Sequence, residues 1–329
     1  MPLADETRAP VLRVAVINDF LRVFAQATDW SRLNGVASVD FFHDHLDTAD
    51  KAAERLAPYD VVITERERTH FTSELLQRLP RLRLLVTTGT HNRYIDFAAA
   101  ARLGITVTRT QAILHAAPEL AMGLILALMR RIVVDHEVMR AGGWQSGIGR
   151  SLRGKTLGII GLGVTGPQVA HLARAFGMQT LAWSPHLDDA RAAAAQTRRM
   201  PLDDLLSQSD VVSLHMVLAD STRGMIGQRE LALMKPDAYL VNTSRGALVD
   251  QDALVEALRE RRIAGAGLDV YETEPLPPEH PLRTLSNVIL TPHTGYVTDE
   301  QYALCFGQAV ENILAYHAGK PVRVMTCNE

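Results

Sequence analysis

Three side chains with complementary chemistry each follow a predicted strand. They are Arg245, Glu274 and His293, after strands predicted at residues 238–242, 264–270 and 288–291. A guanidinium fork can hold a carboxylate through two charge-assisted hydrogen bonds and polarise the adjacent carbonyl. A histidine can give or take a hydroxyl proton, and a neighbouring carboxylate orients its ring and favours its charged form. Singly, each residue is most simply a loop residue, but together they predict a site that interconverts a carbonyl and a hydroxyl group.

The hydride for such a reaction must come from a cofactor, because no side chain supplies one. Gly161, Gly163 and Gly166 follow a short apolar strand with the spacing of the dinucleotide fingerprint. Val164 and Thr165, between the last two glycines, are assigned to the same site because the following helix directs its free N–H groups at phosphates. Ligands of such sheets bind beyond the carboxyl ends of the strands, so the glycine turn and the three side chains are expected on one edge.

The composition of the chain limits the classes of protein to which it can belong. The chain has 329 residues, enough for about two domains, and a net charge of −3 that gives no case for nucleic acid or an anionic membrane. Its two cysteines, Cys305 and Cys327, lie far from any CxxC pattern or histidine cluster, which predicts neither a disulfide framework nor a zinc site. Residues 1–10 lack the apolar segment of a signal peptide, and the apolar run 120–129 is too short to span a bilayer. We therefore expect a cytoplasmic protein with a loose N-terminal arm.

Strands alternate with helical patterns through most of the chain, which predicts two doubly wound parallel α/β domains. The first domain is expected at residues 1–112 with the C-terminal helix, 298–329, and has a plausible flavodoxin-like strand order. A Rossmann-type cofactor domain, 113–297, is expected between these two segments. The pattern further predicts a helix at 21–33, one long helix at 118–140 followed by a loop with Trp144, and a capping box of Thr298 and Gln301 at the last helix.

Four motifs in this order and spacing resemble the D-isomer-specific 2-hydroxyacid dehydrogenases, including the glyoxylate/hydroxypyruvate reductases, over nearly the whole chain. They are the glycine turn 161–166, Val-Asn-Thr-Ser-Arg-Gly at 241–246, Leu-Asp-Val-Tyr-Glu-Thr-Glu-Pro at 268–275 and Thr-Pro-His at 291–293. The resemblance implies an oxidoreductase that moves a hydride between NAD or NADP and a small D-2-hydroxy or 2-keto acid. It also implies a homodimer formed through the cofactor domain.

The resemblance assigns roles to particular residues. Arg245 binds the substrate, and His293 is the acid/base that Glu274 pairs with. Asp269 contacts the nicotinamide carboxamide, and His215, which ends another strand, is placed in the cofactor site. Backbone amides of the turn Thr88–Gly89–Thr90 help to hold the substrate carboxylate.

The second strand of the cofactor domain departs from the family at a position that matters. The family often carries an acid there that binds the ribose hydroxyls, whereas this chain has Ser184. Without that carboxylate a 2′-phosphate is not repelled, so NADP becomes possible. No arginine follows directly, the nearest being Arg191 and the pair Arg198–Arg199, so the choice between NAD and NADP stays open.

The substrate also stays open. Glyoxylate, hydroxypyruvate and other 2-keto acids fit the motifs, and a short-form phosphoglycerate dehydrogenase is an alternative. His91 and Arg93 are candidates for contact with a polar substrate tail, although surface exposure explains them as well. Some relatives with the same three side chains are dinucleotide-sensing binding proteins, such as transcriptional corepressors, so a catalytically weak binding protein is the alternative from another class.

Overall fold

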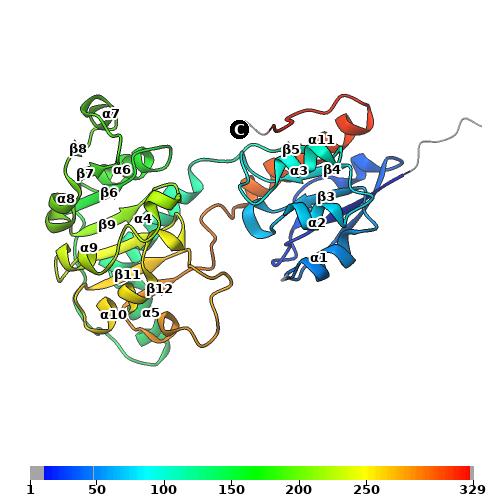
Figure 1. Cartoon of the computed structure of the whole chain (residues 1–329). Helices are drawn as coiled ribbons and strands as arrows, with labels where there is room; N and C mark the ends of the chain where they lie inside the picture. Colours follow the sequence, from blue (N-terminus) through cyan, green and yellow to red (C-terminus); the bar gives the residue numbers. More distant parts are fainter. Residues whose placement is uncertain (1–10, 47, 327–329) are drawn as a thin grey trace, which may run out of the picture. The chain divides into compact units, whose positions relative to one another are not determined.

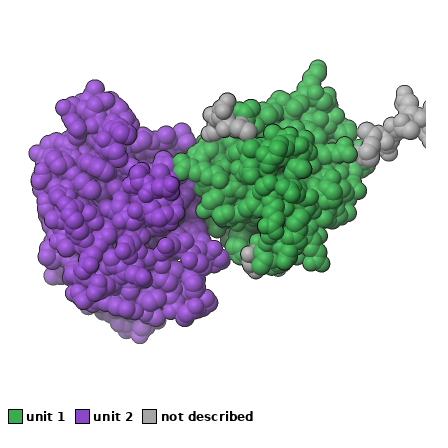
Figure 2. All heavy atoms as spheres, viewed as in Figure 1, with its two compact units in different colours: residues 1–113, 297–329 green, residues 114–296 purple. Residues whose placement is uncertain are grey.

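The computed structural model describes residues 11–46 and 48–326. The predicted N-terminal arm and Cys327 lie outside these residues. The chain divides into two compact units, residues 1–113 with 297–329 and residues 114–296, which Figure 2 shows in two colours. Each unit is built on its own parallel sheet (Figure 1). The predicted fold class, two doubly wound parallel α/β domains, is confirmed.

The first unit contains a five-stranded sheet in the order β2-β1-β3-β4-β5, which is the flavodoxin-like order. Its strands are β1 (Leu12–Val16), β2 (Ala37–Phe41), β3 (Val61–Thr64), β4 (Leu84–Thr87) and β5 (Thr106–Arg109). β3 and β4 are buried along their whole length, as parallel strands covered on both faces must be.

Helices cover both faces of this sheet. They are α1 (Ala49–Leu56), α2 (Ser73–Gln77), α3 (Phe97–Arg102), α11 (Asp299–His317) and the 3₁₀ helices η1 (Phe24–Gln26), η2 (Trp30–Leu33) and η3 (Arg66–Arg68). The core formed with α1, α2 and α3 includes Leu56, Leu75 and Leu85. α11 packs within this unit, where the rings of Phe306 and Phe24 lie 4.4 Å apart.

The second unit contains a seven-stranded sheet in the order β12-β11-β10-β9-β6-β7-β8. Counted from its own first strand, the order is 7-6-5-4-1-2-3, which is the order of dinucleotide-binding domains with one strand added. The strands are β6 (Thr156–Ile160), β7 (Gln179–Trp183), β8 (Arg198–Arg199), β9 (Val211–Leu214), β10 (Tyr239–Asn242), β11 (Gly265–Leu268) and β12 (Val288–Leu290).

Two cores lie on the two faces of this sheet, because successive strand residues point to opposite faces. Leu240 belongs to the core under α8, α9 and α10, whereas Val241 belongs to the core under α4, α6 and α7. The helices are α4 (Ala116–Met129), α5 (Ile132–Arg140), α6 (Gly166–Ala175), α7 (Asp189–Ala194), α8 (Leu202–Gln208), α9 (Gln228–Leu233) and α10 (Gln251–Arg259), with η4 (Asp220–Thr222), η5 (Gly246–Leu248) and η6 (Pro281–Thr284).

Three local predictions were wrong. The helix expected at 118–140 is two helices, α4 and α5, because Arg131 takes a left-handed conformation with φ 57° between them. The helix expected at 21–33 is only the 3₁₀ turns η1 and η2. Of the predicted capping box, Thr298 caps α11, but the Gln301 side chain accepts the N–H of Ile113 instead of that of Thr298.

Candidate active site

Glu274 and His293 form a close pair at the carboxyl edge of the seven-stranded sheet. Oε2 of Glu274 lies 2.6 Å from Nδ1 of His293, and its Oε1 accepts the N–H of Tyr271 at 3.0 Å. A carboxylate can only accept from the ring, so Nδ1 carries the hydrogen, and a proton exchanged with another molecule would pass through Nε2. His293 has a φ of 56°, a strained conformation that occurs where the surroundings fix the backbone.

The loop that carries His293 is fastened to Asp269, which follows β11 and is almost fully buried. Its carboxylate accepts the Thr291 hydroxyl at 2.6 Å, and the N–H groups of Thr294 and Gly295 at 2.8 Å each. Burial raises the pKa of the Asp269 carboxyl group, and these three hydrogen bonds and the charge of His293 oppose that rise. Both carboxylate oxygens of Asp269 therefore accept hydrogen bonds from the loop around His293.

Arg245 is held by the turn that follows β10. Asn242 accepts the N–H of Ser244 and donates to the carbonyl oxygen of Arg245 at 2.9 Å, which fixes the turn to the strand end. The backbone of Gly246 packs directly on that of Tyr271, where a Cβ atom would meet the carbonyl carbon at 1.9 Å. The loops that carry Arg245 and Glu274 therefore lie in contact, and only glycine allows that approach.

The glycine turn joins the same edge at β6 and β9. Gly161 has a φ of 101° and packs on the backbone of His215, and a Cβ on Gly166 would lie 2.1 Å from the Gly161 carbonyl oxygen. At Gly163, by contrast, a Cβ would meet nothing within 4 Å. The three positions thus provide the tight turn, the open backbone and the close helix contact that dinucleotide binding requires.

Two buried polar atoms near these strand ends have no hydrogen-bond partner in the described part of the chain. They are Nδ1 of His215, after β9, and Oγ1 of Thr243, after β10. Burial lowers the pKa of His215 to about 4, so its ring is neutral near pH 7, with Nε2 2.9 Å from the Ser213 hydroxyl. Buried polar atoms are normally paired, and these two fit a polar ligand lying along the edge. The residues therefore fit the nicotinamide dinucleotide that the glycine turn predicts.

The predicted substrate loop lies in the other unit, after β4. The N–H of Thr88 donates to the Thr64 carbonyl oxygen at 3.0 Å, and that of Gly89 donates to the Thr110 hydroxyl at 2.8 Å. Of the three predicted donors, Thr90 alone keeps its N–H clear of hydrogen bonds to the described residues. The loop can therefore offer a substrate fewer amides than the sequence suggested.

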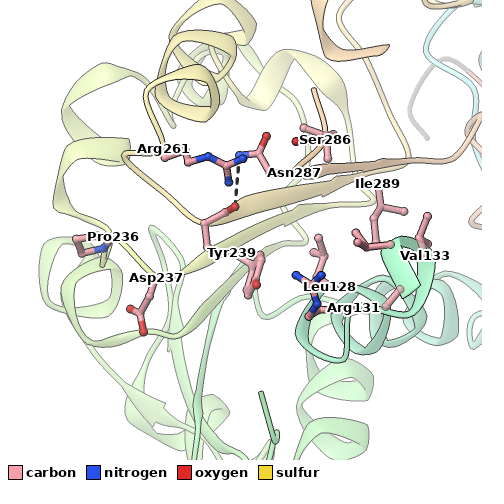
Figure 3. A pocket seen from close by; sticks show the side chains of 14 residues that line it. Leu128, Arg131, Val133, Pro236, Asp237, Tyr239, Arg261, Ser286, Asn287 and Ile289 are labelled. Atoms are coloured by element: carbon pink, nitrogen blue, oxygen red, sulfur yellow. Dashed lines mark hydrogen bonds between the residues drawn. The ribbon is translucent and has the colours of Figure 1, made fainter. Parts of the chain in front are cut away.

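A hollow of about 520 Å³ lies at the opposite, amino edge of the seven-stranded sheet (Figure 3). It is bounded by the end of α4, the first turn of α5 and the residues that enter β10, β11 and β12, among them Leu128, Val133, Tyr239 and Asn287. None of the predicted site residues lines it, so it is separate from the edge that carries Glu274 and His293.

Comparison with known proteins identifies the family. A sequence model of the D-isomer specific 2-hydroxyacid dehydrogenases, NAD binding domain, matches residues 122–295. A glyoxylate reductase from Aeropyrum pernix is 42% identical over 82% of this chain and 82% of its own length. The chain belongs to the D-isomer-specific 2-hydroxyacid dehydrogenase family. It is accordingly an NAD(P)-dependent oxidoreductase.

Two further relatives show the range of the family. A D-3-phosphoglycerate dehydrogenase from Methanocaldococcus jannaschii is 38% identical over 77% of this chain but only 49% of its own length. The crystal structure of a phosphoglycerate oxidoreductase from Vibrio cholerae superposes with a TM-score of 0.87 at 34% identity, over 94% of this chain and all of that one. The fold is thus shared over nearly the whole length.

Two negative findings apply to the described residues. They contain no group of three or more His, Cys, Asp and Glu side chains arranged to hold a metal ion. They also contain no helix long and apolar enough to cross a membrane.

Sequence reasoning missed two features of the site. The fastening of the His293 loop by Asp269 depends on main-chain N–H groups at Thr294 and Gly295, which residue types do not reveal. The buried hydroxyl of Thr243 had a usable signal, because it directly follows β10, but a threonine after a strand is too common to single out.

Proposed function

We propose that this enzyme reduces a small 2-keto acid to the D-2-hydroxy acid, with His293 as the acid/base and Arg245 as the carboxylate-binding residue. The contact that carries the proposal is the 2.6 Å pair of Glu274 and His293 on the same edge as the glycine turn. The bound nicotinamide supplies or accepts the hydride when the cofactor is present.

The protein's part in the reaction is to hold the acid and move one proton. With Nδ1 bonded to Glu274, the charged His293 ring can deliver the Nε2 proton to the substrate oxygen as that oxygen gains negative charge. Glu274 stabilises the charged ring before the transfer and keeps its plane fixed, since its other oxygen is tied to the main chain at Tyr271. In the reverse direction the neutral ring accepts the hydroxyl proton at Nε2.

Arg245 suits the substrate carboxylate because a guanidinium matches its two oxygens with two parallel N–H donors. Small keto acids place the carboxylate next to the carbonyl, so an arginine that holds one also polarises the other. This geometry supports a 2-keto acid over a ketone without an acidic group.

The proposal is tested by mixing the purified protein with NADH or NADPH and a panel of glyoxylate, hydroxypyruvate, pyruvate and 3-phosphohydroxypyruvate, and following oxidation of the dinucleotide. We expect oxidation with at least one small keto acid, and the panel separates a glyoxylate or hydroxypyruvate reductase from a phosphoglycerate dehydrogenase. Dinucleotide binding without oxidation on any member would overturn the proposal and favour the corepressor-like alternative.

We also propose that the chain forms a homodimer through the unit that carries the glycine turn. α5 has nine residues and buries none of them, although it begins Ile-Val-Val. Isolated helices of this length are unstable, so exposed apolar side chains on such a helix are normally covered. Further apolar side chains are exposed nearby in sequence, with Trp144 73% and Ile148 94% accessible, and the hollow at the amino edge reaches the same helix.

Light scattering of the purified chain tests the dimer. We expect twice the mass of one chain, and one chain mass for the double variant Trp144→Ser, Ile148→Ser. Val217→Ser, which changes an exposed apolar residue of another loop, is the matched control and should stay dimeric. A single-chain mass for the unaltered protein would contradict the proposal.

A further inference from the structure

Arg191 of α7 lies against the glycine turn. Its Nη2 donates to the carbonyl oxygen of Leu162 at 3.2 Å, and its Nη1 donates to that of His186 at 3.3 Å. Leu162 stands between the first two glycines of the turn. Because a guanidinium carries five N–H donors and these bonds use two, the group keeps donors for a further acceptor at the turn.

Ser184 approaches the same residue of the turn from the end of β7. Its Oγ lies 3.4 Å from the Leu162 N–H. Ser184 and Arg191 therefore both contact the main chain of Leu162. Ser184 lies at its N–H, and Arg191 lies at its carbonyl oxygen. In dinucleotide domains the end of this second strand faces the ribose of the adenosine, where a carboxylate binds the 2′-hydroxyl and a nearby arginine accommodates a 2′-phosphate.

The acidic residues around Arg191 already serve other groups. Asp188 caps α7 by accepting the Arg191 main-chain N–H at 2.7 Å, and Asp189 pairs with Arg199 at 3.4 Å. The contacts of the Arg191 guanidinium among the described residues are both with neutral carbonyl oxygens. Its positive charge is thus available to a phosphate.

We propose that Ser184 and Arg191 form a binding site for the 2′-phosphate, so that the enzyme takes NADP(H) in preference to NAD(H). The proposal rests on the proposed function, since it assumes a dinucleotide on the glycine turn. The hydroxyl at position 184 accepts or donates one hydrogen bond without repelling the phosphate. The guanidinium provides the positive charge.

Isothermal titration calorimetry tests the site without turnover, using NADP⁺ and NAD⁺, and 2′,5′-ADP and 5′-ADP as the shorter pair. We expect the unaltered protein to bind each 2′-phosphorylated ligand at least about 10-fold more tightly than its partner, as hydrogen bonds to a charged group imply. Arg191→Ala should reduce that ratio about 10-fold and leave NAD⁺ affinity nearly unchanged. Ser184→Asp should weaken NADP⁺ by a similar factor through charge repulsion.

Arg198→Ala is the matched control, because Arg198 lies on the neighbouring strand β8 and its side chain contacts Gln208 instead. It should leave both affinities unchanged. Equal affinity of the unaltered protein for NADP⁺ and NAD⁺ would overturn this inference alone, as would an Arg191→Ala variant that loses both ligands equally. Failure of both dinucleotides to bind would overturn the proposed function as well.

Discussion

The two edges of the seven-stranded sheet use charged and polar residues in different ways. At the amino edge Asp210 accepts the N–H of Thr156 at 2.8 Å and pairs with Arg150 at 3.3 Å and Lys235 at 3.4 Å. Burial alone would raise the pKa of Asp210, but the Thr156 N–H and the charges of Lys235 and Lys155 outweigh it and hold that pKa below its ordinary value. Both oxygens of the Asp210 carboxylate therefore interact with other groups of the protein.

At the carboxyl edge, by contrast, some buried polar atoms have no hydrogen-bond partner among the described residues. Nδ1 of His215 and Oγ1 of Thr243 lack hydrogen bonds to the described residues, and His293 is held in a strained backbone conformation. In the described part of the chain, two buried Nε atoms also lack hydrogen bonds, in Arg131 and Arg262, and both belong to guanidinium groups paired with carboxylates. The difference indicates that the amino edge stabilises the unit and the carboxyl edge keeps its polar capacity for a ligand.

Loss of the acid/base at the carboxyl edge should have the largest effect. For His293→Ala we expect turnover to fall by at least ~100-fold, because the variant lacks the ring that we propose exchanges the proton. Dinucleotide affinity and thermal stability should stay nearly unchanged. Steady-state kinetics and calorimetry check this, with His171→Ala, an exposed histidine of α6, as the control. Undiminished turnover would remove His293 from the reaction.

Exchange of the guanidinium for an ammonium group should have the next largest effect. For Arg245→Lys we expect kcat/KM to fall roughly 10- to 100-fold, since a point charge replaces the fork that matches a carboxylate. Arg259→Lys, an exposed change at the end of α10, is the matched control and should leave kcat/KM unaltered. Equal kinetics for the two variants would show that Arg245 does not bind the substrate.

A substitution at the amino edge should lower stability and leave turnover unchanged. For Asp210→Asn we expect about 2 kcal/mol less unfolding free energy, with turnover per folded molecule unchanged. Arg150 and Lys235 both lose the Asp210 carboxylate, and among the described residues Arg150 keeps only its pair with Asp237. The folded pKa of Asp210 is depressed, so its stabilisation is present above the unfolded pKa, near 4, and is lost as pH falls through the folded value. Urea unfolding at pH 7 and at pH 3 checks both statements. Lost turnover with unchanged stability would break the distinction between the edges.

The sequence predicted the fold and family well because their signals are periodic and local. Alternating apolar strands and helices indicated the two parallel sheets, and the spacing of Gly161, Gly163 and Gly166 indicated the turn. It failed at Arg131, where a left-handed residue divides one apolar pattern into two helices. Apolar periodicity continues across such a break, so only the backbone reveals it.

For the site, the sequence predicted strand-end positions and one contact, and the roles of the residues stay predictions. Chain order placed Arg245, Glu274 and His293 after successive strands, and the family resemblance implied the pairing of the last two, which the structure has at 2.6 Å. The position of Arg191 against Leu162 was out of reach, because α7 has six residues and its orientation depends on the packing of the folded unit. Loop hydrogen bonds of this kind have no residue-type signature.

The most direct test of the account is to follow the hydride itself. The enzyme is supplied with a reduced dinucleotide that carries deuterium in the transferred position, together with hydroxypyruvate or the best keto acid of the panel with a chiral product. We predict one deuterium at C2 of the product, which should be the D isomer, and no labelled product from His293→Ala over the same time. An unlabelled or L product, or equal labelling by the variant, would contradict the account.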